Sequence, residues 1–170
     1  MADRPAPLDP AVVLAASQVV CVLEGVNDHE NLGAIARSAA ALGVDALLLD
    51  PSCADPLYRR SIRVSMGYAL SLPTTRLRPW PSALAALAGG GWTTVALTPD
   101  RAAPPLRALF AAAPPRVAIV LGAEGPGLSP GALGVATHLA RIPMAPGVDS
   151  LNVSHAAAIA FHHLGRGTAG

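Results

Sequence analysis

Short apolar runs alternate with longer amphipathic segments along most of the chain. Four almost continuously apolar runs have the character of parallel strands covered on both faces, at residues 18–23, 46–49, 93–97 and 116–121. Four intervening segments are predicted to be helices, at residues 32–42, 82–88, 105–112 and 151–164. With a weaker strand ending at Ile142, the pattern predicts an α/β fold, a mostly parallel sheet with helices on both faces.

One domain accounts for this pattern, since the 170 residues contain no internal repeat and no linker long enough to divide them. Residues 1–16 are expected to be a loose lead-in with a short helix, and residues 17–170 the domain itself. Ligands of parallel α/β sheets bind beyond the carboxyl ends of the strands. The segments that follow the strands are therefore the places to search for chemistry.

Composition and charge exclude several classes of protein. The chain is 52% hydrophobic and 14% charged, unlike a disordered segment, and its net charge of +1 argues against nonspecific coating of nucleic acid. All twelve basic residues are arginine, a bias that a GC-rich coding sequence explains. Five of them are close enough in sequence to form a basic patch: Arg59, Arg60, Arg63, Arg76 and Arg78.

Secretion, membrane insertion and metal binding find no support in the sequence. The first ten residues are Pro-rich and contain Asp, unlike a secretory signal, and the apolar run at 11–23 is shorter than the roughly 20 residues that cross a bilayer. Cys21 and Cys53 are too few for a disulfide framework, and the five histidines lack metal-ligand spacing. We therefore expect a cytoplasmic protein with no metal and no membrane partner.

The segment after the first strand, EGVNDHENLGAIARSAAALGV, combines a helix start with an isolated arginine. Asp28 or Asn31 can cap the helix. Arg37 lies off the apolar face, between small neighbours that leave room for a bulky ligand. Arg37 can instead be interpreted as a solvated surface arginine, with Asn31 only capping the helix. Taken by itself, this segment favours the surface interpretation over a ligand site. The apolar face is expected to be buried and consists of Leu32, Ile35, Ala36, Ala39 and Leu42.

The segment after the strand at 116–121, VLGAEGPGLSP, places three glycines around one carboxylate. Gly122, Gly125 and Gly127 would let a ligand approach the backbone closely, with Glu124 beside it. The pattern is neither a P-loop nor a dinucleotide-binding fingerprint. A plain turn explains the glycines equally well, but it leaves the isolated charge at the end of a strand unexplained.

The third segment, DSLNVSHAAAIAFHHLG, contains the start of the last helix. Ser150 is expected to be the N-cap of this helix, and Gly165 the residue that ends it. Capping by Ser150 leaves Asn152 and Ser154 unexplained. A helix start with several small polar side chains can also bind a carboxylate or a phosphate, so both interpretations stay open.

Three motifs in this order resemble those of one family. NLGAIAR near the start, GAEGPGLS in the last third and IPM…SLNVSHAAAIA at the end are similar to the three motifs of the SpoU/TrmH family, RNA 2′-O-ribose methyltransferases of the SPOUT class. RVSMGYALSLP, at 63–73, resembles the family's segment between its second helix and third strand. The resemblance covers residues 18–164, and three motifs at family-like spacing are far more specific than any one of them.

The resemblance implies a C-terminal trefoil knot and S-adenosyl-L-methionine as the cofactor. The knot would be built from the second and third segments, with the cofactor bent inside it. The implied partner is RNA, either tRNA or rRNA, with no DNA, and relatives act as homodimers. Seven positions are implied as cofactor contacts: Thr98, Leu121, Gly122, Gly127, Ile142, Met144 and Leu151.

The implied reaction moves a methyl group from the sulfonium to a ribose 2′-oxygen. Five polar residues match the family's site: Arg37, Asn31, Glu124, Ser150 and Asn152. Because arginine stays protonated in proteins, Arg37 is expected to bind a phosphate and stabilise the developing alkoxide. Asn31 would orient Arg37 or the ribose, and the other three would fix the geometry around the cofactor.

Two departures from the family bear on ligand binding. Pro146 stands where relatives often have glycine, which shifts the flexible point of the cofactor loop. No part of the chain resembles the separate N-terminal substrate domain of many relatives, so Arg59, Arg60 and Arg63 are the candidate RNA surface, unless the chain is the catalytic portion of a longer protein. The competing hypotheses are a SPOUT module that binds RNA or cofactor without chemistry, and an unrelated nucleotide-binding α/β enzyme.

Overall fold

A computed structural model describes residues 8–110 and 114–164 of the chain. Its six strands form one sheet in the order β3-β2-β1-β5-β4-β6, and all five pairings are parallel. The strands are β1 Val19–Glu24, β2 Ala46–Leu49, β3 Thr74–Arg76, β4 Thr93–Leu97, β5 Val117–Gly122 and β6 His138–Ala140. The helices are α1 Pro10–Ala15, α2 His29–Ala41, α3 Arg59–Val64, the 3₁₀ turn η1 Tyr68–Leu70, α4 Ser82–Gly89, α5 Leu106–Leu109, α6 Pro130–Val135 and α7 Val153–His163.

Two hydrophobic cores lie on the two faces of the sheet. Along β1, Cys21 and Leu23 point into the core that contains α2, α5 and α7. The alternate residues Val20 and Val22 point into the core that contains α1, α4 and α6. Both faces of the central strands are therefore covered, which is why these strands are apolar at every position. The predicted α/β fold with a mostly parallel sheet is confirmed.

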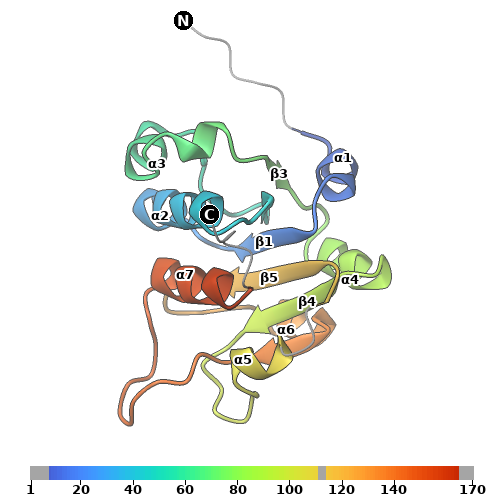
Figure 1. Cartoon of the computed structure of the whole chain (residues 1–170), viewed down its shortest axis with the longest axis vertical. Coiled ribbons are helices and arrows are strands. Elements are labelled where there is room, and N and C mark those ends of the chain that lie inside the picture. Colours follow the sequence, from blue (N-terminus) through green and yellow to red (C-terminus); the bar gives the residue numbers. More distant parts are fainter. Residues whose placement is uncertain (1–7, 111–113, 165–170) are drawn as a thin grey trace, which may run out of the picture.

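The carboxyl ends of the strands and the starts of two helices share one edge of the molecule. In Figure 1 the arrowheads of β1, β4 and β5 point to the left, and α2 and α7, which pack against each other, begin on that side. The loops after these strands therefore meet the N-termini of the two helices.

Several predicted boundaries are wrong. The strand expected to end at Ile142 ends at Ala140, and the helix expected at 32–42 spans His29–Ala41. The last helix begins at Val153, and its N-cap is Asn152 and not Ser150. The predicted helix at 105–112 is limited to Leu106–Leu109, although its residues 111 and 112, like Gly165, lie outside the described residues. Among the described helices, none is long and apolar enough to cross a membrane.

The described part of the N-terminal lead-in is packed, contrary to the expectation that it is loose. Val13 of α1 is buried in the second core. The hydroxyl of Thr75 in β3 donates a 2.6 Å hydrogen bond to the carbonyl oxygen of Leu8. Asp9 caps α1 through a 2.9 Å bond from the backbone N–H of Ala11. Residues 8–16 therefore belong to the same folded unit as the sheet.

Candidate functional site

A cavity of about 420 Å³ opens at the carboxyl edge of the sheet. Its volume lies within the range of pockets that enclose small ligands and cofactors. Its walls come from the ends of β4 and β5, the segment that follows β6, and the first turn of α7. All seven positions that the resemblance implies as cofactor contacts line it: Thr98, Leu121, Gly122, Gly127, Ile142, Met144 and Leu151.

The loop after β5 folds back tightly on the end of its own strand. The backbone N–H of Gly127 donates a 3.0 Å hydrogen bond to the carbonyl oxygen of Ala123. A Cβ atom on Gly122 would lie 2.2 Å from the carbonyl carbon of Gly127, so only glycine permits this close approach. Gly125, with φ +86°, reverses the chain next to Glu124. The loop thus exposes the Glu124 carboxylate at the wall of the cavity.

Asn152 joins three segments that are far apart in the sequence. Its Oδ1 atom caps α7 by accepting hydrogen bonds from the backbone N–H and the hydroxyl of Ser154, at 2.9 and 2.5 Å. Its Nδ2 atom donates to Oδ1 of Asn31 at 2.9 Å and to the carboxylate of Glu124. Glu124 also accepts a 3.3 Å bond from the backbone N–H of Val153. The polar start of α7 therefore serves both as a cap and as part of a polar network beside the cavity.

The first turn of α2 leaves Asn31 free to join this network. Asp28 is the N-cap of α2, because its carboxylate accepts a 2.7 Å hydrogen bond from the backbone N–H of Glu30. Asn31 is buried in the first turn of the helix, and its side chain points toward Asn152. Of the two capping candidates, Asp28 caps the helix, and Asn31 contacts Asn152 of the last motif.

Two of the five predicted polar residues lie outside the network. Ser150 lines the cavity but is exposed. Arg37 is exposed on α2, six residues and about 9 Å along the helix axis from Asn31, and it does not line the cavity. Within the described residues, Arg37 forms no ion pair or side-chain hydrogen bond, so its guanidinium is available to a ligand. The structure therefore brings together Asn31, Glu124 and Asn152, with Ser150 nearby.

The proposed arginine patch is smaller than the sequence suggests. Arg59, Arg60 and Arg63 are exposed on α3, and Arg60 forms an ion pair with Glu30, which raises the pKa of its guanidinium. Arg76 is half-buried and donates hydrogen bonds of 2.7–3.2 Å to three backbone carbonyl oxygens of the segment after β2. Arg76 holds that segment in place, so it does not belong to the predicted basic patch as a group that is free to bind RNA.

A buried carboxylate at the end of β1 supports the loop after β5. Glu24 accepts a 2.5 Å hydrogen bond from the indole of Trp80, and bonds of 2.8 and 2.6 Å from the backbone N–H and hydroxyl of Ser129. Ser129 in turn caps α6. Glu24 was not among the predicted site residues, although an acidic residue that ends an apolar run is a detectable signal. Leu97 and Pro99 line the cavity without having been predicted, although their places at the end of β4 and just after it could have identified them.

A cysteine nucleophile is excluded by burial. Cys21 and Cys53 are both buried as free thiols. Burial, followed by the hydrogen bond and negative charge of Asp50, raises the pKa of Cys53 to about 12, and burial raises the pKa of Cys21 still further. Neither thiol forms the reactive thiolate near neutral pH.

The arrangement of the motifs matches one known family. The model of the SpoU rRNA Methylase family matches residues 18–162, which include all six strands. The chain belongs to the SpoU family. The region that matches the family model contains the complete cavity and the polar network of Asn31, Glu124 and Asn152.

SpoU relatives and solved structures are similar over nearly the whole chain. A Mycobacterium tuberculosis (strain H37Rv) protein described as an uncharacterized tRNA/rRNA methyltransferase is 51% identical over 166 residues, 93% of this chain and 58% of its own. The 23S rRNA (adenosine(1067)-2′-O)-methyltransferase of Streptomyces laurentii is 38% identical over 148 residues, 86% of this chain and 54% of its own. The AdoMet-bound rRNA methyltransferase of Sinorhizobium meliloti has a TM-score of 0.80 and 28% identity, covering 96% of this chain and 61% of that chain.

The chain spans only part of the length of these three proteins, between 54% and 61% of each. The similarity therefore concerns the domain that carries the three motifs. It does not extend to the rest of the longer relatives.

Proposed function

We propose that the protein is an S-adenosyl-L-methionine-dependent methyltransferase that modifies the ribose 2′-oxygen of tRNA or rRNA. The observation that carries this proposal is the hydrogen-bonded group of Asn31, Glu124 and Asn152 beside the cavity. The three family motifs supply one member each. The name of the Streptomyces laurentii relative, an rRNA 2′-O-methyltransferase, supports the reaction class.

The cavity suits this cofactor in shape and in chemistry. Leu97, Leu121 and Ile142 form apolar walls of the kind that enclose a nucleoside ring. Glu124 adds a negative charge, which favours a ligand with a cationic sulfur and ammonium group. We assign the cofactor contacts to the seven lining positions named above, with backbone groups of Gly122 contributing. When bound, S-adenosyl-L-methionine supplies a transferable methyl group on a positively charged sulfur.

The polar residues would position the RNA ribose against that methyl group. Asn31 and Asn152 orient the 2′-hydroxyl, and Glu124 holds Asn152 and the start of α7 in place. Arg37 carries a permanent positive charge, because an arginine guanidinium stays protonated in proteins and cannot act as a base. Its exposed guanidinium would bind a phosphate beside the target ribose and stabilise the negative charge that develops on the 2′-oxygen.

Methyl transfer to RNA tests the proposal directly. The protein is incubated with methyl-labelled S-adenosyl-L-methionine and separate pools of tRNA and rRNA, and the RNA is then digested to nucleosides. We expect labelled 2′-O-methyl nucleosides, at a rate at least tenfold lower in Asn152→Ala and Arg37→Ala. Arg107→Ala is the matched control, since Arg107 is also exposed but lies on α5, and it should keep the full rate. Cofactor binding without methylated RNA in any pool would contradict the proposal.

A binding module without chemistry is the second candidate, because Arg37 lies outside the lining of the cavity. The Arg37→Ala variant separates the two functions. An enzyme loses methylation while RNA binding changes little, whereas a binding module shows no methylation in either form. Calorimetry with S-adenosyl-L-methionine, NAD and ATP further distinguishes both from an unrelated nucleotide-binding enzyme.

We further propose that the C-terminal segment forms a trefoil knot. Support comes from the path of the chain, which leaves β6 at the sheet edge and returns to α7, packed on α2 and β5 near the sheet centre. On the way it contacts the loop after β5 through Glu124 and Asn152. Single-molecule stretching tests the knot, since a knotted chain stops short of the roughly 3.3–3.6 Å per residue of a fully extended one.

A homodimer and a cytoplasmic location complete the proposal. Val148 and Leu151 are exposed apolar side chains next to the cavity, and a second copy of the chain would cover them. Light scattering should give twice the mass of one chain. Residues 17–170 would carry the catalytic machinery, with residues 8–16 packed on the sheet as part of the same folded unit. The cytoplasm would be the compartment that holds its tRNA or rRNA substrate.

A further inference from the structure

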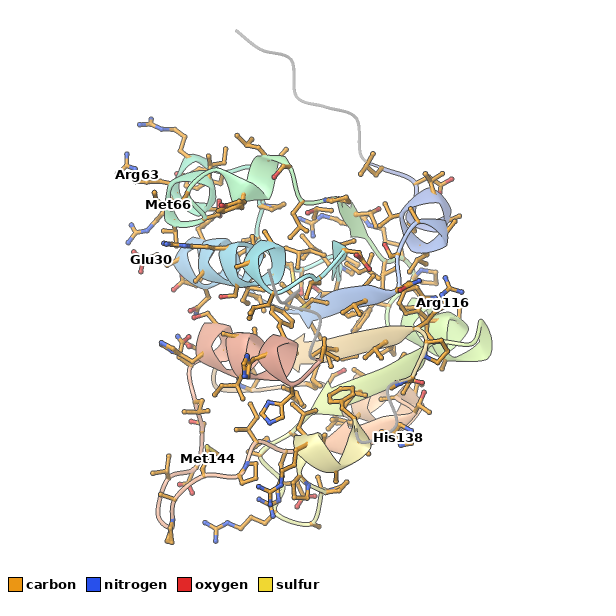
Figure 2. The ribbon with its side chains drawn as sticks, viewed as in Figure 1. Glu30, Arg63, Met66, Arg116, His138 and Met144 are labelled. Atoms are coloured by element: carbon orange, nitrogen blue, oxygen red, sulfur yellow. The ribbon has the colours of Figure 1, made fainter. Side chains whose placement is uncertain are left out.

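An exposed apolar and basic surface follows β2, outside the cavity. Four large apolar or aromatic side chains are exposed between residues 58 and 70: Tyr58, Met66, Tyr68 and Leu70. The arginines of α3 lie in the same segment, and Arg59 and Arg63 have no ion-pair partner within the described residues. Figure 2 shows Arg63, Met66 and Glu30 on the same side of the molecule as Met144, which lines the cavity.

One ring of this surface already packs against another in a tilted arrangement. The rings of Tyr58 and His29 are 4.3 Å apart between centroids, at an angle of 43°. Tyr58 is 53% exposed, so part of its ring remains open to solvent. His29 is the first residue of α2, about 3 Å along the helix axis from Asn31. The ring pair therefore lies at the same helix end as the polar network of the site.

Close packing of α3 on α2 holds this surface in a fixed position relative to the site. A Cβ atom on Gly33 would lie 2.7 Å from the carbonyl oxygen of Ser61 and 2.9 Å from Cβ of Val64. The two helices thus touch through the backbone of Gly33. Tyr58 and the arginines of α3 cannot shift far from Asn31 without breaking this contact.

We propose that the His29–Tyr58 pair is a stacking platform for an unpaired base of the RNA, adjacent to the nucleotide in the site. Single-stranded RNA is recognised by aromatic side chains that stack on bases and by arginines that bind the neighbouring phosphates. Here Tyr58 supplies the ring, and Arg59 and Arg63 supply unpaired positive charge. The charge favours a polyanion over an apolar protein partner. The inference deepens the proposed function, on which it rests.

Binding of short RNA with and without bases tests the platform. The probes are a fluorescein-labelled 12-nucleotide oligoadenylate and an abasic RNA strand of the same length, measured by fluorescence anisotropy. Tyr58→Ala should weaken binding of the oligoadenylate by about 5- to 150-fold, the range for loss of one stacking aromatic. Tyr58→Phe should restore it, and binding of the abasic strand should change less than twofold.

Val12→Ala is the control, since Val12 is an exposed apolar side chain on α1, outside this surface. It should weaken binding of the oligoadenylate less than threefold. Unchanged binding in Tyr58→Ala, or an equal loss for the abasic strand, would overturn the platform. A change of oligomeric state in Tyr58→Ala without a change in RNA binding would also overturn it, because the surface would then be a contact between protein chains.

Kinetics separate this inference from the proposed function. With RNA as the varied substrate, Tyr58→Ala should raise KM, while calorimetry should show unchanged affinity for S-adenosyl-L-methionine. If the unaltered protein methylates RNA and Tyr58→Ala has the same KM, the platform is wrong and the proposed function stands. If the unaltered protein binds RNA through Tyr58 and never methylates it, the proposed function is wrong and the platform stands.

Discussion

Gly122 is the residue at which the site depends most on the absence of a side chain. A Cβ atom there would lie 2.2–2.4 Å from the backbone of Gly127 and Leu128, and no side-chain movement relieves a clash with backbone. We predict that Gly122→Ala lowers the free energy of unfolding by about 1–3 kcal/mol, the usual range for overpacking. To make room for the new methyl group, the loop after β5 must move away from the strand. Because this loop lines the cavity, affinity for S-adenosyl-L-methionine should fall at least tenfold in calorimetry.

Gly134→Ala provides the control for this prediction. Gly134 lies in α6, and a Cβ atom there would meet nothing within 4 Å. Alanine at this position should be neutral or slightly stabilising, because it is the better helix former. Equal cofactor affinity in the two variants would show that the loop does not form the cofactor site.

Helices α2 and α3 form the element pair that links the site to the proposed RNA surface. Gly33→Ala would force α3 away from α2, because the new methyl group meets the backbone of Ser61 at 2.7 Å. We predict weaker binding of the oligoadenylate by at least fivefold and a loss of about 1–3 kcal/mol of stability. Cofactor affinity should stay within twofold, since neither helix lines the cavity.

The matched change is Gly89→Ala at the end of α4, where a Cβ atom has open space. It should leave RNA binding unchanged. A Gly33→Ala protein that binds the oligoadenylate normally would mean that the position of α3 is not important for RNA.

The longer elements could be predicted from the apolar pattern, and the short ones could not. The central strands β1 and β5 are apolar at consecutive positions because both faces are buried. The strand β3 and the helix α6 have only three and six residues, too few for a period to emerge. The N-cap of α7 was wrongly predicted because Ser150 and Asn152 are both good caps. The choice depends on Asn31 and Glu124, which no local sequence reveals.

Stability of the whole molecule should depend on Asp50 at low pH. Its carboxylate accepts hydrogen bonds from Gly25, Ser52 and Cys53. Burial raises the pKa of Asp50, but these bonds outweigh burial and hold it below the ordinary value of 3.8. A lowered pKa stabilises the folded state above the ordinary value, and that stabilisation is lost as the pH falls through the lower, folded-state pKa.

Urea unfolding at a series of pH values from about 2 to 7 measures this dependence. We predict that Asp50→Asn is less stable than the unaltered protein at pH 7, and that the difference shrinks as the pH falls below about 4. Asp149→Asn, at an exposed position, should follow the unaltered protein throughout. A constant difference across the range would show that the ionised form of Asp50 is not what stabilises the fold.

At the scale of the molecule, the sequence was informative about where the cavity lies and less so about which charged side chains are free to bind a ligand. The rule that ligands lie beyond the strand ends led to the loops that do line the cavity. The seven contact positions came from resemblance, since no periodicity identifies a position such as Met144. Proximity in sequence misassigned Arg76, which the fold turns toward backbone carbonyls. Charge alone does not reveal such a partner.

The pairing of Val19 with Val117 sets the order in which the protein can be made. While the ribosome synthesises the residues between β2 and β5, β1 has only β2 beside it, and its other edge is open. Such an edge can pair with other chains, and sheets with distant partners fold slowly. The nascent chain therefore carries an unprotected strand edge from the completion of β1 until β5 emerges, the period in which a chaperone would protect it most.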